Sequence, residues 1–543
     1  MLKAGVRFDA AEAPISQGRP GSGSAMAELF LPLDHLLGRG GDPRLSIDAA
    51  SGVNGYGCRP FPCPDTLSFA SSTATSISQR AYDRAHAARE ALMQSAIAAG
   101  IDAVFDARIE AMRGELKACL GLSRADVVFS PSGTDSQLQA LWLARTLLGP
   151  ELTTVIVAAD QTGSGTVETA RGNHFSAATA QGSRVRKGEP IAGLAHSVTT
   201  VALPLLDAAG EFRTPAETDA QVLGAIEQAI ANGNVLLQIM DSSKLGWRAP
   251  SKTCLDEIAA RWPDRVQVVV DACQMRLGRP RLQHYLDRGY IVIVTGSKFF
   301  TGPPFSGALL VPQGLSNALD AVAAVAPGLQ DYSSRSDWPM QWRRLRSHFP
   351  IRANFGQWLR WEAALEEIRA YYQVPGEFRA RMLTGFGDGV RRIIASSPSL
   401  DLLPPQQRPE HDNLDDEDLA QPTIFAFVIK HNGCALALDD CRKIYRALAQ
   451  DVRTDVFTDA RERDPAIAAQ VCLIGQPVAL GESAALRICA SARLVTECWS
   501  SQEDVARENL QRELGHVGAV VAKVEWLLAH MDNLNLVEVS RGA

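Results

Sequence analysis

The sequence has no hydrophobic run that approaches the roughly 20 apolar residues required for a membrane-spanning helix. Residues 1–14 also lack the apolar core of a secretory signal peptide. A basic excess is missing too, because 54 lysines and arginines face 61 aspartates and glutamates, for a net charge of −7. These absences argue against a membrane or nucleic-acid partner, and we expect a cytoplasmic protein.

Paired cysteines are also missing from the chain. The ten cysteines are dispersed along 543 residues, none forms a CxxC pair, and no cysteine–histidine cluster has zinc spacing. We therefore expect free thiols and no metal site. Apolar residues make up 46% of the chain, which is enough for a large core and excludes global disorder.

From about residue 123 the chain alternates short apolar segments with helical ones. The apolar segments are rich in valine and isoleucine and have no charge in their middles, which is typical of strands buried on both faces of a parallel sheet. The alternation predicts a doubly wound α/β domain. The expected strands are 125–130, 153–159, 197–204, 234–241, 266–272, 290–296 and 307–312.

The same pattern divides the chain into three parts. Residues 1–76 are rich in glycine, proline and serine and are expected to form an irregular N-terminal arm, followed by the large domain over 77–335. A smaller α+β domain is expected over 336–543, with a solvated acidic linker or insertion near 401–422. Helical stretches are expected over 78–122, 215–232 and 251–262, and several helical segments over 354–398. The later strands are 423–430 and 484–491.

Two turns at strand ends carry small or hydroxyl residues, and parallel sheets bind ligands at the carboxyl ends of their strands. Ser132, Gly133 and Thr134 stand between the first strand and a helix, where free N–H groups suit a phosphate. Turns of this composition also occur simply as helix caps. Ser243 follows strand 234–241, and its hydroxyl could reach a ring oxygen of a ligand.

Two charged residues end other strands. Asp271 ends an apolar strand, where a carboxylate needs a cationic or hydrogen-bonding partner, although it could also cap the next helix. Lys298 follows strand 290–296 among Phe, Gly and Pro, and a desolvated lysine can provide a nucleophilic amine. A lysine that reaches out to solvent is the alternative. One crossover separates the two residues, so we expect both at the same sheet edge.

Residues 271–274, Asp-Ala-Cys-Gln, are followed by Thr-Gly-Ser-Lys at 295–298 and by Gly-Pro-Pro-Phe-Ser-Gly at 302–307. This pair of motifs resembles the class V aminotransferase superfamily, which includes cysteine desulfurases and kynureninase. The resemblance covers the sheet domain and extends into the C-terminal domain. It implies a fold-type I enzyme with pyridoxal 5'-phosphate as cofactor, an amino acid as substrate and a homodimer as assembly.

The resemblance also implies roles for individual residues. Lys298 would form the Schiff base with the cofactor, Asp271 would pair with the pyridine nitrogen, and Gln274 would hydrogen-bond the phenolic oxygen. Arg487, in Leu-Arg-Ile-Cys, is similar to the family's arginine that clamps the substrate carboxylate. Residues implied to bind the phosphate or to lie near the ring oxygen are Ser132, Gly133, Thr134, Ser243, Thr295 and Ser297. Asn54 and Tyr56 are expected to line the entrance to the site.

Two departures from the family pattern bear on the reaction. The turn after strand 153–159 has no aromatic residue to stack on the pyridine ring. Gln161 or Thr162 could lie over the ring instead, or His174 or Phe175 could substitute. Ser297 also stands where desulfurases usually have a histidine, so the resemblance to that branch is incomplete.

Three functions are compatible with these residues. The first is an aminotransferase in which Lys298 moves the α-proton. The second is a C–S lyase or cysteine desulfurase, and the desulfurase would need a reactive thiolate. Cys472 is the candidate thiol, but its surroundings predict a strand, and Ile474 aligns better with the family cysteine. The third is a non-catalytic binding protein of the same fold, which the joint presence of Lys298, Asp271 and Arg487 disfavours.

Overall fold

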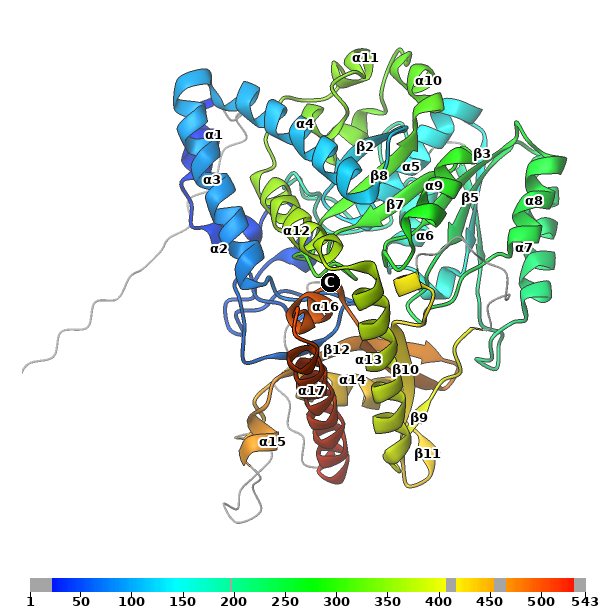
Figure 1. The fold of residues 1–543 in the computed structure, drawn as a ribbon. Helices are drawn as coiled ribbons and strands as arrows, with labels where there is room; N and C mark the ends of the chain where they lie inside the picture. The colour runs from blue at the N-terminus through cyan, green and yellow to red at the C-terminus, as the bar shows by residue number, and fades with distance from the viewer. Residues whose placement is uncertain (1–21, 196–197, 407–416, 454–464, 532–543) are drawn as a thin grey trace, which may run out of the picture.

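The computed structural model describes residues 22–195, 198–406, 417–453 and 465–531. Two β-sheets with their helices form the upper and lower parts of the molecule in Figure 1. No helix within the described ranges combines the length and apolarity needed to cross a bilayer. The predicted α/β class, with a mainly parallel large sheet and a smaller C-terminal α+β part, is confirmed.

The large sheet has the strand order β2-β8-β7-β6-β5-β3-β4 within the described residues. Its strands are β2 (Ala125–Ser130), β3 (Leu152–Val157), β4 (Val198–Leu203), β5 (Asn234–Met240), β6 (Val266–Asp271), β7 (Ile291–Thr295) and β8 (Gly307–Pro312). Neighbouring strands from β7 to β4 pair in parallel, whereas β8 is antiparallel to both β2 and β7. The carboxyl ends of every strand except β8 therefore lie at one edge of the sheet.

Helices cover both faces of this sheet, as the continuous apolar strands require. On one face the core includes side chains from α7 (Pro215–Ile230), α8 (Lys252–Arg261) and α9 (Arg279–Asp287). On the other face it includes α5 (Gly133–Leu148), next to which α6 (Thr166–Arg171) packs. The short helices α10 (Ser316–Asp320) and α11 (Arg343–Arg346) follow the last strand. This doubly wound arrangement leaves the carboxyl edge free for a site.

Two predicted helical stretches each form two helices, separated by a residue that stops the first. The segment 78–122 forms α3 (Gln79–Ala99) and α4 (Ile101–Leu120), because Gly100 between them has φ +80°, outside the helical region. The segment 354–398 forms α12 (Phe355–Gln373) and α13 (Gly376–Ser396). Pro375 lies between these two, and proline has no N–H to continue a helix.

The second sheet brings together strands that are far apart in the sequence. Its strands are β1 (Leu67–Phe69), β9 (Leu400–Leu402), β10 (Ile424–His431), β11 (Cys434–Ala435), β12 (Cys472–Leu480) and β13 (Ser483–Cys489). Its helices are α14 (Leu438–Leu448), α15 (Pro465–Ala469), α16 (Ala492–Cys498) and α17 (Glu503–Ala529). The N-terminal arm is less irregular than expected, since it forms α1 (Ser22–Leu29), α2 (Leu33–Leu37) and strand β1, which pairs with β12.

The acidic segment near 401–422 is packed where the structure describes it, and 407–416 lie outside the described residues. Strand β9 pairs with β10, and Asp418 is buried. The Asp418 carboxylate accepts hydrogen bonds from the Tyr371 hydroxyl at 2.5 Å and from Arg379 Nε at 2.7 Å. The flanks of this segment thus attach to α12 and α13 instead of being solvated as we expected.

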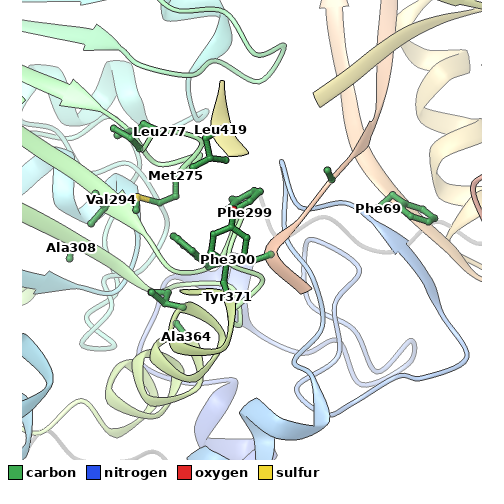
Figure 2. Close-up of a cluster of buried hydrophobic side chains, with 14 of the residues drawn as sticks. Phe69, Met275, Leu277, Val294, Phe299, Phe300, Ala308, Ala364, Tyr371 and Leu419 are labelled. Atoms are coloured by element: carbon green, nitrogen blue, oxygen red, sulfur yellow. The ribbon is translucent and has the colours of Figure 1, made fainter. Parts of the chain in front are cut away.

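An aromatic cluster holds the loop that follows β7. Phe299 and Phe300 both make edge-on contacts with Tyr371 of α12, with ring centroids 5.3 and 5.7 Å apart. Figure 2 shows the three rings grouped together, with Met275 nearby. Because these two phenylalanines directly follow Lys298, their burial fixes the backbone that carries the lysine.

We predict that Phe300→Ala lowers the free energy of unfolding by about 3–5 kcal/mol, because it removes a buried ring from this cluster. Phe30→Ala is the matched control, since Phe30 is 59% exposed whereas Phe300 is 1% exposed. The control should change stability by no more than about 0.5 kcal/mol. Denaturant unfolding of both variants measures the difference, and equal effects would contradict the anchoring role.

Candidate functional site

The strand order places the predicted turns along one edge of the large sheet. Ser130 at the end of β2 and Thr295 at the end of β7 both pair with Gly307 of β8. The ends of β6 and β5 follow β7 in the sheet, and these strands carry Asp271 and the turn with Ser243. Four segments therefore meet at this edge. They are the turn before α5, the turn after β5, the end of β6 and the loop after β7.

The turn before α5 packs closely on the ends of β6 and β7. A Cβ atom on Gly133 would lie 2.6 Å from Cys273 Sγ and 3.5 Å from Thr295 Cγ2, so only glycine allows this approach. Ser132 caps the helix, with its Oγ accepting a hydrogen bond from the Asp135 N–H at 3.2 Å. The N-terminus of α5 thus lies directly beside the ends of β6 and β7, as a phosphate site requires.

Thr134 and Thr295 contribute packing as well as hydroxyls to this edge. A Cβ on Gly165 would lie 2.8 Å from Thr134 Cγ2, so the turn after β3 covers Thr134. The Thr295 hydroxyl donates to the Cys273 carbonyl at 2.7 Å. Ser297, next to Lys298, is 8% exposed.

Asp271 is partly exposed at the end of β6 and accepts only uncharged donors among the described residues. Its Oδ1 accepts from the Cys273 N–H at 3.1 Å, and its Oδ2 accepts from Gln137 Nε2 at 3.2 Å. Thr169 in turn donates to the Gln137 amide oxygen at 3.3 Å. Sequence reasoning missed Gln137, although it lies one helical turn after Gly133 on α5. The carboxylate keeps its charge available for a cationic partner.

Lys298 is partly exposed and lies in the loop after β7. In the part of the chain that the structure describes, its Nζ has no hydrogen-bond or salt-bridge partner. Its backbone is fixed, because its carbonyl accepts from the Thr301 N–H at 2.9 Å and the following side chain is buried in the aromatic cluster. The structure thus presents an uncompensated amine from a rigid loop.

Gln274 and Ser243 use their polar atoms within the protein. Gln274 Nε2 donates to the Ser72 carbonyl at 3.0 Å, and its Oε1 accepts from Arg276 Nε at 3.4 Å. Ser243 Oγ accepts from the N–H groups of Leu245 and Trp247 at 3.1 and 3.0 Å. The Ser243 hydroxyl proton stays available to a ligand, whereas Gln274 mainly joins the N-terminal arm to the large domain.

Asn54 also has a local structural role. Its buried side-chain oxygen accepts from the N–H groups of Tyr56 and Cys58 at 2.9 and 3.1 Å. Tyr56 lies near Arg44 and Phe305, with its ring 6.3 Å from that of Phe305. The Asn54 oxygen that we expected at the entrance thus closes its own loop.

Arg487 on β13 is 1% exposed and joins the two sheets. Its Nη1 donates to the Lys244 carbonyl at 3.1 Å, and its Nη2 donates to the Gln476 carbonyl at 2.6 Å and to Thr73 Oγ1 at 3.4 Å. Its Nε has no partner among the described residues. Burial lowers the pKa of Arg487. The residue is buried, and most of its donors form hydrogen bonds within the protein.

Lys244 is the functional candidate that sequence reasoning overlooked in the turn after β5. Burial lowers its pKa to about 8, and the positive charges of Arg487 and Lys298 act in the same direction. Asp160 and Asp271 oppose this shift. The sequence could have revealed Lys244 as a candidate, because it is a lysine that follows the end of a buried strand. The same feature singled out Lys298.

The residues considered for stacking on a ring have different roles in the structure. The His174 ring is paired with the Tyr332 hydroxyl at 2.6 Å, and Phe175 packs in the core against Tyr332. Thr162 donates to a backbone carbonyl of its own turn. Gln161 is 2% exposed, and neither atom of its amide has a partner among the described residues. Buried amides are normally paired, which leaves Gln161 as the best placed of the four to contact a ligand.

Cys472 is buried in β12, where Leu67 of β1 pairs with it. Burial raises the pKa of its thiol to about 11. A nucleophilic thiol instead needs a lowered pKa and an accessible position. The prediction of a structural thiol in a strand agrees with this environment. Among the described residues, no group of three or more His, Cys, Asp or Glu side chains could hold a metal.

No protein-family model matches the sequence, and no curated protein matches it. Solved structures with similarity include a NifS-like protein, at 11% identity and a TM-score of 0.48, over 83% of this chain and 98% of that one. A complex of the cystine C–S lyase C-DES with cysteine persulfide has 14% identity and a TM-score of 0.47, over 83% and 97%. A third similar structure has 14% identity and a TM-score of 0.45, over 85% of this chain and 81% of that one. It is the glutamate decarboxylase domain of diaminobutyrate-pyruvate transaminase and L-2,4-diaminobutyrate decarboxylase from Vibrio parahaemolyticus.

We predict that Gly133→Ala lowers the free energy of unfolding by about 1–3 kcal/mol, because its methyl group would overlap Cys273 Sγ. Combining it with Cys273→Ala should recover most of that loss, since the smaller side chain vacates the space. Thermal unfolding of both single variants and the double variant gives the coupling. A double variant whose loss equals the sum of the single losses would refute the proposed contact.

Proposed function

We propose that the protein is a pyridoxal-phosphate-dependent enzyme that acts on an amino acid, with Lys298 as the residue that binds the cofactor covalently. The observation that carries this proposal is the pair of unsatisfied charges that follow neighbouring strands: the amine of Lys298, in the loop after β7, and the carboxylate of Asp271, at the end of β6. When bound, the cofactor would supply an electron sink for the bonds at the substrate α-carbon.

The residues at this edge suit such a cofactor. Asp271 has only neutral donors around it within the described residues, so its charge is available to a protonated ring nitrogen. The N-terminus of α5, with Gly133 lacking a side chain, suits the phosphate group. Thr134 and Ser297 would add hydroxyl donors there, whereas the Thr295 hydroxyl, which donates to the Cys273 carbonyl, would contribute only by its position. The Ser243 hydroxyl and the Gln274 amide are the candidates for the ring oxygen.

Transfer of an amino group is the reaction that we propose. The Lys298 amine would take the α-proton from the substrate and return it at a neighbouring atom, as a general base and acid. Arg487 would attract the substrate carboxylate with its remaining donors. The buried thiol of Cys472 does not support a cysteine desulfurase. We also propose a homodimer, as the resemblance of the motifs at 271–274 and 295–298 implies, and a cytoplasmic location, in which the ten free cysteines would stay reduced.

The cofactor assignment is tested by absorbance. After reconstitution with pyridoxal phosphate, the protein should show a band at about 410–430 nm that Lys298→Ala abolishes. Lys252→Ala is the control, because Lys252 is an exposed lysine of α8 that pairs with Asp256 at 2.6 Å. The control should keep the band. A wild-type protein without the band after reconstitution would overturn the proposal.

The reaction is tested by incubating the holoenzyme with amino acids, cysteine included, and measuring keto acids, pyruvate and sulfide. We expect an amino group to reach an added keto acid, and we expect Cys472→Ala to leave the rate unchanged because its thiol is buried and largely protonated. Cys254→Ala, at another buried thiol, is the control. Sulfide release that Cys472→Ala alone abolishes would favour a desulfurase, and sulfide release that it leaves intact would favour a C–S lyase.

A further inference from the structure

The turn that carries Lys244 is rigid. Ser243 Oγ accepts two backbone N–H groups of this turn, the Ser243 N–H donates to the Trp247 carbonyl at 2.8 Å, and the Gly246 N–H donates to the Ser243 carbonyl at 3.0 Å. Gly246 has φ +84°, which lets the chain reverse here without strain. The backbone of Lys244 is therefore held in place at the end of β5, next to the end of β6 that carries Asp271.

Arg487 ties this turn to the second sheet. Its Nη1 donates to the carbonyl of Lys244, so the guanidinium lies next to the residue that carries another cation. Carbonyls and a hydroxyl already take three of its five N–H groups, and the side chain is fully buried. Arg487 thus has few donors left for a ligand, whereas Lys244 is partly exposed.

The Lys244 amine lacks the hydrogen bonds that hold a lysine with a purely structural role. Lys523 gives the comparison within this chain, because its Nζ donates to the carbonyls of Leu448, Gln450 and Gln470. Lys244 Nζ has no hydrogen bond or salt bridge within the described residues. A largely buried ammonium without a partner is costly, unless a ligand supplies the negative charge.

Three cations come from the same edge of the molecule. The Arg487 guanidinium is hydrogen-bonded to the Lys244 carbonyl, and Lys298 follows β7, two strands along the sheet from β5. The positive charges of Arg487 and Lys298 both act to lower the pKa of Lys244. Asp160 and Asp271 oppose the shift, yet the pKa of Lys244 stays lowered. Asp160 also accepts the backbone N–H groups of Leu205 and Leu206, and Asp271 is the predicted partner of the ring nitrogen. If Lys298 binds the cofactor, Lys244 and Arg487 leave two positive charges for the substrate.

We propose that Lys244 binds a second carboxylate of the substrate, so that the enzyme prefers dicarboxylic amino acids. Arg487 would attract one carboxylate and Lys244 the other. Arg487 is hydrogen-bonded to the backbone of Lys244 itself, so the two cations come from one small region, which a dicarboxylic substrate would span. This inference rests on the proposed function, and it adds the class of substrate.

The test compares Lys244→Met, Lys244→Arg and the control Lys252→Met in the reconstituted enzyme. The measured quantity is kcat/KM for glutamate or aspartate divided by kcat/KM for alanine. We expect the wild type to prefer the dicarboxylic substrates, and Lys244→Met to lower this ratio at least about ten-fold, as loss of a charge-assisted hydrogen bond would. Lys244→Arg should retain much of the preference, and Lys252→Met should retain all of it.

A second measurement does not depend on turnover. Binding of succinate and of propionate to the holoenzyme is measured by calorimetry, and Lys244→Met should weaken succinate binding at least about ten-fold more than propionate binding. Equal losses for both acids, or a wild type without a preference for dicarboxylates, would overturn the role of Lys244. Either result leaves the cofactor assignment standing, whereas a missing absorbance band would remove the proposed function itself.

Discussion

The parallel pairing of β5, β6 and β7 places the carboxyl ends of these three strands at one edge of the large sheet. The reactive side chains that end or follow the strands, Lys244, Asp271 and Lys298, are therefore at that edge as well. Parallel strands need crossovers, so the turns that follow them collect at one side of the domain. Asp271 and the two lysines that follow β5 and β7 come from segments far apart in the sequence, yet neighbouring strands carry them. The close approach of Gly133 to Cys273 adds the N-terminus of α5 to the same edge.

The loop after β7 is held from outside the large sheet. Phe299 and Phe300 pack on Tyr371 of α12, and the Tyr371 hydroxyl is bonded to Asp418, which lies in the acidic segment between β9 and β10 of the second sheet. Apolar burial of this size stabilises the loop by several kcal/mol, on the order of 1.5–3 kcal/mol for each ring. The position of Lys298 therefore depends on the packing between the two parts of the molecule.

Uncompensated charge distinguishes the proposed site from the other buried charges of the protein. Glu362 and Glu367 are fully buried, and each is paired with arginines. Lys523 is bonded to carbonyls. Lys244 and Lys298 have neither kind of partner within the described ranges. Desolvated charges are stable only when they are paired, and this is the physical basis of the proposal that these lysines bind anionic ligands.

The sequence by itself determined the class of fold and the strands of the large sheet. Continuous apolar runs of valine and isoleucine and the turns between them are local signals, and the strands 125–130 and 307–312 have the predicted bounds. Local signals also singled out Lys298 and Asp271, because a charged residue at the end of a buried strand is unusual wherever the strand lies.

Only the tertiary structure decided the pairings between distant segments. Strand β1 pairs with β12. The Asn54 side chain accepts hydrogen bonds from the backbone of its own loop, and Arg487 donates most of its hydrogen bonds to other groups of the protein. The charge cluster around Lys244 also appears only after folding, because it depends on residues of β5, β7 and β13. Sequence periodicity reports which faces are buried, whereas the partner of a polar group depends on which strands become neighbours.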